Sequence, residues 1–349
     1  MPRPTIRTIA LAAKVSNCTV SRALRGDTHL SEKTRERIQN LAREMGYEVN
    51  AYVSSWMAHV RSTKVETPFQ GCLGYLNYHK THQPLTMWDT PRRQIEGATA
   101  RALELGYRLE HLAVWHEGLS RERVQQILHT RAIQGILLPV SGQLAEIDLS
   151  FDSLACVAIG HHITQPPVHF TSADHHAMIL TACKELSKSG YQRIGLVLAD
   201  DSDQRLELRP SSAFLGWQHR LPKSRHIPPL LHKKELEEAF LIDWCRRYRV
   251  DSILCPHAFR GTKIERCLVD NNFRIPEDIA IATLDWHGAS RDEAGVDQRH
   301  ELIGAAAVDI LVHMLNHNVY GIPKTPRSTL IEGVWRPGAS APTSPPPRR

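Results

Sequence analysis

The sequence predicts an all-helical N-terminal module followed by a larger α/β body built from two similar halves. Three observations predict this organisation. Residues 5–46 read as three short amphipathic helices. From residue 70 onwards, short apolar runs alternate with amphipathic helices, the pattern of parallel sheets covered on both faces. The net charge of +6 lies entirely in residues 1–64, which carry 11 Lys and Arg against 5 Asp and Glu, so the rest of the chain is neutral.

The composition excludes several classes of protein. No apolar run is long enough to span a bilayer and no signal core opens the chain, so we expect a cytoplasmic, nucleoid-associated protein with no membrane partner. The seven cysteines lack C-x-x-C spacing, which favours buried free thiols in a reducing compartment. The chain has no phosphate-binding loop, no G-x-G-x-x-G after a strand and no G-x-S-x-G elbow. We therefore expect no enzyme activity, no catalytic residues and no cofactor.

Capping residues and inward apolar positions define the three N-terminal helices. Thr5, Ser16 and Ser31 are placed to cap helices that begin at residues 6, 17 and 32, and Lys14 and Val15 make a short turn between the first two. The inward positions are Ile6, Ile9, Ala10 and Ala13 in the first helix, Val20, Ala23 and Leu24 in the second, and Ile38, Leu41, Ala42 and Met45 in the third. Two short helices joined by a tight turn, with a third as support, form a helix-turn-helix unit.

The outward residues of the second helix, within VSNCTVSRAL, are short apart from one arginine. Such a unit places its second helix in the major groove of DNA. Arg22 has the reach to donate two hydrogen bonds to guanine, Asn17 to read adenine and Cys18 to pack on a thymine methyl group. Phosphate contacts are expected from Ser16, Thr19 and Ser21. The alternative is a three-helix bundle with an ordinary polar face.

The segment TIRTIALAAKVSNCTVSRALRGDTHLSEKTRERIQNLAREMGY closely resembles the headpiece of the LacI/GalR family of bacterial transcription regulators. By this resemblance, Asn17, Cys18 and Arg22 occupy base-reading positions. The resemblance gives phosphate contacts to Thr5, Ser16, Thr19, Ser21, Ser31 and Thr34, and Arg25 joins this DNA-binding set. It implies a dimer that binds a palindromic double-stranded DNA operator, as a repressor, with an affinity set by a small-molecule effector.

The family resemblance implies a hinge helix in the segment NAYVSSWMAHVRSTKVETP, which folds when the dimer sits on DNA. In the family, an apolar hinge residue wedges into a base step of the minor groove. Here Trp56 falls at the wedge position, with Met57 beside it. The alternative is that both side chains pack against the body or the partner hinge.

The body begins with the first of eight apolar runs. These are CLGYLNY (72–78), LEHLAVW (109–115), GILLPV (135–140), ACVAIG (155–160), RIGLVLA (193–199), SILCP (252–256), IAIATLD (279–285) and STLIEGVW (328–335). Helical stripes lie between them, among them Leu236, Ala239, Phe240 and Trp244. The segments GYQRIGLVLAD and NNFRIPEDIAIATLDW extend the resemblance, which implies a two-lobed, periplasmic-binding-protein-like (type I) sensor body.

The resemblance places effector contacts at the carboxyl ends of the body strands. The family's R-x-x-G-[FW] element matches 213–217 without its arginine, which Arg205 or Arg209 would replace. Asp285 is kept from the family's G-x-D-D, but Trp286 takes the place of the second Asp, where it would stack on a saccharide. The Asn-Asp after the strand at 252–256 becomes His257-Ala258.

Further strand-end candidates are His79 and His161, against the alternative of ordinary structural histidines. The family implies a sugar or sugar derivative as effector. The departures leave open a regulator controlled by a protein partner, with a vestigial cleft. No metal site is expected, because the adjacent pairs at 161–162 and 175–176 point apart and no carboxylate or cysteine completes a ligand set.

The expected domain organisation follows from these segments. We predict a helix-turn-helix headpiece at 1–48, a hinge helix and linker at 49–68, a two-lobed effector-binding and dimerisation domain at 69–336 and a disordered tail at 337–349. Lobe 1 takes about 69–165 and 293–324, and lobe 2 about 166–292 and 325–336, so the chain crosses between lobes near residues 165, 292 and 325.

Overall fold

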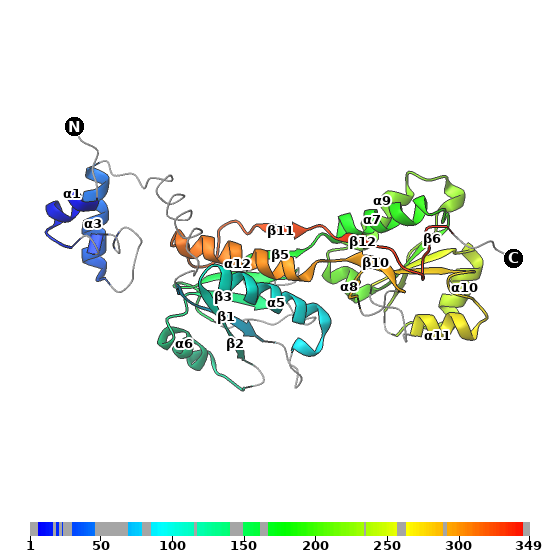
Figure 1. The fold of residues 1–349 in the computed structure, drawn as a ribbon, viewed down its shortest axis with the longest axis horizontal. Coiled ribbons are helices and arrows are strands. Elements are labelled where there is room, and N and C mark those ends of the chain that lie inside the picture. Colours follow the sequence, from blue (N-terminus) through cyan, green and yellow to red (C-terminus); the bar gives the residue numbers. More distant parts are fainter. Residues whose placement is uncertain are drawn as a thin grey trace.

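A computed structural model gives the fold of most of the chain (Figure 1). It describes residues 6–16, 19–20, 23, 30–45, 69–78, 85–114, 117–139, 149–160, 167–233, 235–256, 263–288 and 292–344. The predicted hinge, including Trp56 and Met57, lies outside these residues. Within them, no helix has the length and apolarity needed to cross a membrane.

The N-terminal module is built around a small apolar core, as predicted. Its helices are α1 (Ile6–Ala13) and α3 (Glu32–Glu44), and Thr19, Val20 and Ala23 between them are also helical. The buried core consists of Ile9, Ala10, Ala13, Val20, Ala23, Ile38 and Ala42. Leu41 and Met45, predicted to face inward, pack against it while partly exposed.

The first sheet of the body is entirely parallel, with strand order β11-β5-β4-β3-β1-β2. Its strands are β1 (Gly71–Asn77), β2 (Tyr107–Ala113), β3 (Gly135–Pro139), β4 (Ala155–Ile159), β5 (His169–Ala173) and β11 (Ser328–Ile331). The associated helices are η1 (Leu85–Met87), α5 (Asp89–Glu104), α6 (Arg121–Thr130) and α12 (His300–Asn316). Alternate residues of β3 face opposite cores: Leu137 packs with α5 and α12, and Ile136 and Leu138 pack with α6.

The second sheet has the order β12-β10-β9-β8-β6-β7 and is parallel except for the edge strand β12. Its strands are β6 (Ile194–Ala199), β7 (Leu230–His232), β8 (Ser252–Cys255), β9 (Ala280–Thr283), β10 (Ala294–Asp297) and β12 (Val334–Arg336). Its helices are α7 (His175–Lys188), α8 (Asp200–Arg205), α9 (Arg209–Gln218), η2 (Lys223–Arg225), α10 (Glu238–Tyr248) and α11 (Lys263–Asp270). Side chains of α7 and α9 share one apolar core with α5 and α12, so this core runs through both halves.

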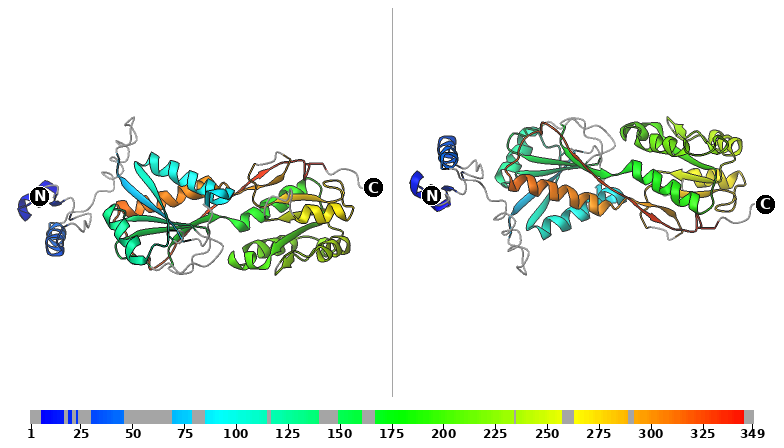
Figure 2. Two further views of the ribbon diagram at one scale, coloured as in Figure 1. Left: turned by 90° about the horizontal axis from the view of Figure 1, so that it is seen from below. Right: turned by 90° about the horizontal axis from the view of Figure 1, so that it is seen from above.

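The chain passes between the two sheets three times, as Figure 2 shows. The connections follow β5, β10 and β11, at residues 174, 298–299 and 332–333. Each is later than predicted, because β5, β10 and β11 still pair in the sheet that they leave. The predicted single strand at 328–335 is likewise wrong: it divides at Gly333 into β11 of one sheet and β12 of the other.

Two further sequence predictions are corrected. The predicted stripe over 236–244 is half right: Leu236 and Trp244 are buried, but Ala239 and Phe240 are exposed, and the buried face of α10 carries Leu241, Ile242, Trp244 and Cys245. The helix begins only at Glu238, so Leu236 precedes it and does not set the helical stripe.

The predicted disordered tail is wrong for residues 337–344, which the structure describes. Ser340 is 1% exposed, and its hydroxyl donates to Ile281 O and accepts from Ala294 N, both at 2.8 Å. The Ser340 backbone also pairs with Asp292 O and Ile281 N, so the segment runs alongside the second sheet.

Candidate functional site

The turn after α1 is closed by backbone hydrogen bonds. Lys14 adopts a left-handed φ of 54°, Val15 N donates to Ala10 O at 3.0 Å and Lys14 N donates to Leu11 O at 3.3 Å. This pair of bonds is the Schellman arrangement, which ends a helix and reverses the chain within two residues. It confirms the predicted short turn and sets the start of the next helix close to α1.

Two equivalent caps start the second and third helices of the module, as the sequence predicts. Ser16 Oγ accepts from Thr19 N at 3.0 Å and contacts Thr19 Oγ1 at 2.8 Å. Ser31 Oγ does the same with Thr34, at 3.4 Å from the amide and 2.8 Å from the hydroxyl. Each cap satisfies an amide at a helix start and leaves an exposed serine beside it. Hydroxyls and helix-start amides of this kind are typical phosphate ligands.

Side chains of α3 bind the backbone of the other two helices, which sequence reasoning missed. Arg37 Nη2 donates to Ala13 O at 3.2 Å, and Gln39 Nε2 donates to Ala23 O at 2.9 Å. Ala13 is the last residue of α1, where a carbonyl lacks an intrahelical donor. The third helix is therefore tied to α1 and to the helical residue Ala23.

All three predicted base-reading residues lie outside the described part of the chain, together with several other DNA-binding candidates. The DNA-binding candidates outside the described residues are Thr5, Asn17, Cys18, Ser21, Arg22, Arg25 and Trp56. Their roles stay predictions.

A second site lies where the two sheets face each other. In both sheets the carboxyl ends of the parallel strands lead to the connecting segments, the usual location of ligands in open α/β folds. After β9, the Thr283 hydroxyl accepts from Asp285 N at 3.1 Å and shapes a turn that carries Asp285 and His287. His300 starts α12, which packs on the first sheet.

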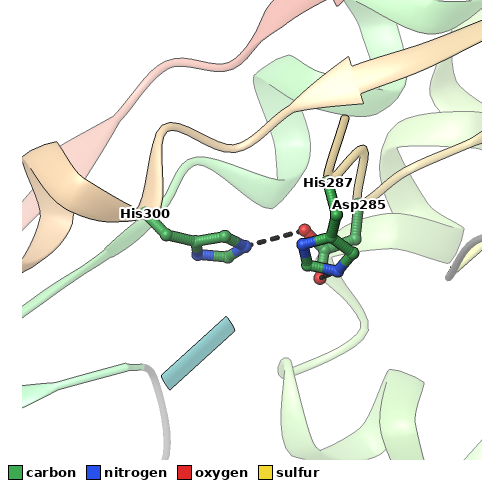
Figure 3. A group of neighbouring side chains, drawn as sticks. All are labelled: Asp285, His287 and His300. Atoms are coloured by element: carbon green, nitrogen blue, oxygen red, sulfur yellow. Dashed lines mark hydrogen bonds and ion pairs between the residues drawn. The ribbon is translucent and has the colours of Figure 1, made fainter. Parts of the chain in front are cut away.

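Asp285 is the centre of this site, as Figure 3 shows. Its Oδ1 lies 2.7 Å from His300 Nε2, and its Oδ2 lies 3.3 Å from His287 Nε2. Thr90 of α5 donates to Oδ2 at 3.0 Å. Burial disfavours the charged carboxylate, but hydrogen bonds and charges from His287 and His300 outweigh it and hold the pKa of Asp285 well below its ordinary value. The hydrogen bond to Asp285 in turn raises the pKa of His287.

Arg93 of α5 ties the two halves together beside this cluster. It binds Glu301 through two nitrogens at 2.6 and 2.8 Å, Asp297 Oδ1 at 3.2 Å and the Trp286 carbonyl at 3.3 Å. Burial alone would raise the pKa of Asp297, but the Arg299 amide, Arg336 and Arg93 together hold it below its ordinary value. A buried carboxylate is thereby kept charged between the sheets.

The structure places four of the predicted effector contacts. Asp285 is buried as described, and the Trp286 ring is held by a bond from Nε1 to Glu293 O at 3.0 Å and by Arg336, whose guanidinium lies 5.5 Å from the ring centroid. Arg205 donates to Ser202 Oγ at 2.7 Å, and Arg209 pairs with Glu207 at 3.2 Å. His79, His161 and His257 lie outside the described residues.

Asp203 is a further polar group that the sequence did not single out. It lies in α8, directly after β6, and is 1% exposed. Its Oδ1 accepts from Ser211 N at 3.2 Å, whereas Oδ2 has no hydrogen-bond partner among the described residues. The same holds for Nε of the nearby Arg209.

The headpiece geometry agrees with a match to the model of "Bacterial regulatory proteins, lacI family" over residues 5–50. The headpiece is that of the lacI family. Proteins of this family are transcriptional regulators rather than enzymes. The match covers the two capped helix starts, the turn at Lys14 and the unplaced residues of the second helix.

Relatives and solved structures extend the similarity to the body. It is 25% identical to the transcriptional repressor MelR of Bacillus subtilis, over 93% of this chain and 95% of that protein. The headpiece is 51% identical to that of the repressor CytR of Escherichia coli K12 over 43 residues, 12% of this chain and 13% of that protein.

Two solved structures share the fold. The regulator CelR in complex with cellobiose aligns with a TM-score of 0.52 at 20% identity, covering 96% of this chain and 99% of that one. The lac repressor dimer bound to operator aligns with a TM-score of 0.54 at 15% identity, covering 98% and 100%. These alignments support the predicted two-lobed α/β fold.

Proposed function

We propose that this regulator binds a palindromic DNA operator as a dimer and represses transcription, with an affinity modulated by an effector held between its two sheets. The observation that carries the proposal is the headpiece: a two-residue turn after α1 leads to a second helix capped by Ser16, and Ser31 caps the third, inside a segment that matches the lacI family. A two-fold symmetric operator requires two headpieces, so a dimer is the expected assembly. Operator binding would place the protein on the chromosome, in the cytoplasm.

Within this proposal the domain organisation is a headpiece at 1–48, a hinge at 49–68 and a two-lobed body at 69–336. Asn17, Cys18 and Arg22 would read bases, while Ser16, Thr19, Ser31 and Thr34 would contact phosphates. Trp56 would wedge into the minor groove. The two caps support the phosphate role, because they fix exposed hydroxyls next to helix-start amides.

The direct test is the selection of binding sites from random duplex DNA by the full-length protein at fixed salt, since non-specific affinity depends strongly on salt. We expect a palindrome with half-sites about one helical turn apart. Arg22→Ala should lower affinity for that site more than for random DNA, and Trp56→Ala should reduce bending. Recovery of no preferred sequence, with only salt-sensitive binding to any duplex, would refute specific operator recognition.

A carbohydrate is the effector class that the relatives favour, since CelR was solved with cellobiose. Buried Asp203, with an oxygen that lacks a partner among the described residues, and Arg209 follow β6 at the edge that faces the first sheet. Such groups are suited to ligand hydroxyls. An effector that favours one arrangement of the sheets would shift operator affinity by linkage, typically about 1–3 kcal/mol.

One observation favours a second candidate, a regulator controlled by a protein partner. The Asp285 carboxylate, expected to hold the effector, already contacts Thr90, His287 and His300. A thermal-shift screen of mono- and disaccharides, cellobiose among them, separates the two. Stabilisation by a sugar that also changes operator affinity supports the carbohydrate effector, whereas no shift from any sugar supports the partner.

A further inference from the structure

Three side chains capable of binding metal converge between the two sheets. One ligand atom each from Asp285, His287 and His300 lies within 4.8 Å of the others. Figure 3 shows the His300 ring, from the start of α12, pointing at the carboxylate of Asp285, with His287 beside that carboxylate on the turn after β9. The side chains of Asp285, His287 and His300 are 7%, 13% and 1% exposed, so this is a shielded group of donors rather than a surface coincidence.

The two distances between a histidine nitrogen and the Asp285 carboxylate are similar to those between ligand atoms of a tetrahedral site. Zinc binds histidine nitrogen and carboxylate oxygen at about 2.0–2.2 Å, which separates neighbouring ligand atoms by roughly 3.3 Å. The His287 nitrogen is 3.3 Å from the nearer Asp285 oxygen, and the His300 nitrogen is 2.7 Å from the other. The two histidine nitrogens approach different oxygens of the carboxylate, and the three donor atoms lie within 4.8 Å of one another, so a bound ion would draw the two imidazole rings towards one shared centre.

Neighbouring side chains contact the three donors, as residues that hydrogen-bond to the ligands do in metal proteins. Thr90 Oγ1 donates to Asp285 Oδ2 at 3.0 Å, and Gln94 Nε2 lies 3.5 Å from His300 Nδ1, the ring nitrogen that faces away from Asp285. With a metal on Nε2 the ring proton is on Nδ1, so the Gln94 amide would turn its oxygen towards Nδ1 to accept this hydrogen bond. Metal-binding histidines usually hydrogen-bond through their second ring nitrogen, which fixes the tautomer and the ring plane. Both supporting residues come from α5, so the first sheet's helices hold His300 and the carboxylate in place.

We propose that Asp285, His287 and His300 form a binding site for a divalent transition metal of the Zn²⁺ type, which links the two sheets. Two imidazole nitrogens and one carboxylate favour zinc, nickel or cobalt over magnesium and calcium, which prefer oxygen donors. Three protein ligands leave a further coordination position for water or for an oxygen of a bound molecule. The inference does not depend on the proposed function, because metal binding is measured without DNA. It replaces the expectation from sequence that no metal site exists.

The test uses untagged full-length protein stripped with a chelator and titrated with Zn²⁺ by equilibrium dialysis. We expect one equivalent to bind, and visible absorption typical of tetrahedral coordination when Co²⁺ replaces Zn²⁺. His287→Gln and His300→Gln should each lower the affinity for Zn²⁺ by more than about 100-fold, because removing even a residue that only hydrogen-bonds to a metal ligand lowers metal affinity by about 10–100-fold. Unfolding of the wild type should shift to higher temperature with added Zn²⁺.

The matched control removes a competing pair on the same helix. His313 and His317 of α12 lie with ring centroids 4.2 Å apart, a spacing that also attracts metals. The double variant His313→Gln/His317→Gln should bind Zn²⁺ like the wild type. Loss of binding in that variant, or unchanged binding in His287→Gln and His300→Gln, would overturn the proposal, as would no stoichiometric binding at all. If a glutamine variant fails to fold, X-ray absorption of the zinc-loaded wild type decides: two imidazole ligands support the site, and none refutes it.

Discussion

Ile38→Ala tests whether the small apolar core of the headpiece is what presents its second helix to DNA. Ile38 is 0% exposed. The seven buried residues of that core include only two other side chains larger than alanine, Ile9 and Val20. Truncating a buried isoleucine to alanine costs about 2–5 kcal/mol. A module of about 40 residues has a total stability of roughly 2–6 kcal/mol. The substitution therefore removes most of the stability that the headpiece has.

Limited trypsin digestion of the full-length protein measures this loss. A cost near 3 kcal/mol raises the unfolded population about a hundredfold, so cleavage within residues 6–45 should accelerate by a similar factor when opening is fast. Binding to the selected operator should weaken in parallel. Leu11→Ala is the control, because Leu11 lies in α1 but is 73% exposed, and its loss should change stability by less than about 0.5 kcal/mol. Equal cleavage and equal operator affinity in the two variants would refute the reasoning.

Three further predictions concern the body and are measured by urea unfolding. Arg93→Met should cost about 3 kcal/mol, because it leaves the buried Asp297 carboxylate short of a partner. Arg101→Met, whose partners Glu104 and Asp309 are exposed, should cost less than about 1 kcal/mol, and similar costs for the two variants would contradict the inter-sheet role of Arg93. A Cβ at Gly304 would lie 2.0 Å from a backbone carbonyl of α5, so Gly304→Ala should lower the free energy of unfolding by about 1–3 kcal/mol or more. Gly216→Ala, where a Cβ would have no atom within 4 Å, should be neutral or slightly stabilising, and the reverse order would be inconsistent with close helix packing. The pKa of Asp297 is below its ordinary value, so the stability that its charged form gives the folded protein is present above about pH 4 and is lost as the pH falls through the lower pKa of the folded state. Asp297→Asn should therefore reduce the loss of unfolding free energy in acid, and an unchanged dependence of that free energy on pH would contradict the prediction.

The sequence predicted elements whose signal is local. The run GILLPV became β3 because five consecutive apolar residues bounded by turns have little alternative to a buried strand. The caps at Ser16 and Ser31 were predictable because the bonds that they make reach only three residues along the chain. The strands β5, β7 and β10 were missed: HFTSA, LLH and AGVD are short or polar, and pairing within their sheets decides their structure.

The inter-sheet site was only partly predictable for the same reason. Asp285 was identified from its family position at a strand end. His287 follows it at a spacing of two, which was a usable signal. His300 starts a helix that packs on the other sheet, and no local pattern links it to Asp285. Contacts of this kind arise from the crossing of the chain between the halves, which periodicity does not encode.

The three crossings also fix the order in which the protein becomes complete during translation. The first sheet waits for α12 and β11, and the second for β12 at residues 334–336, so neither half is whole until almost the entire chain has left the ribosome. The headpiece is finished by residue 45. At about 5–20 residues per second, the roughly 290 residues between these points take about 15–60 s to synthesise. Throughout that interval the nascent chain carries the residues of the headpiece core without either completed sheet of the body.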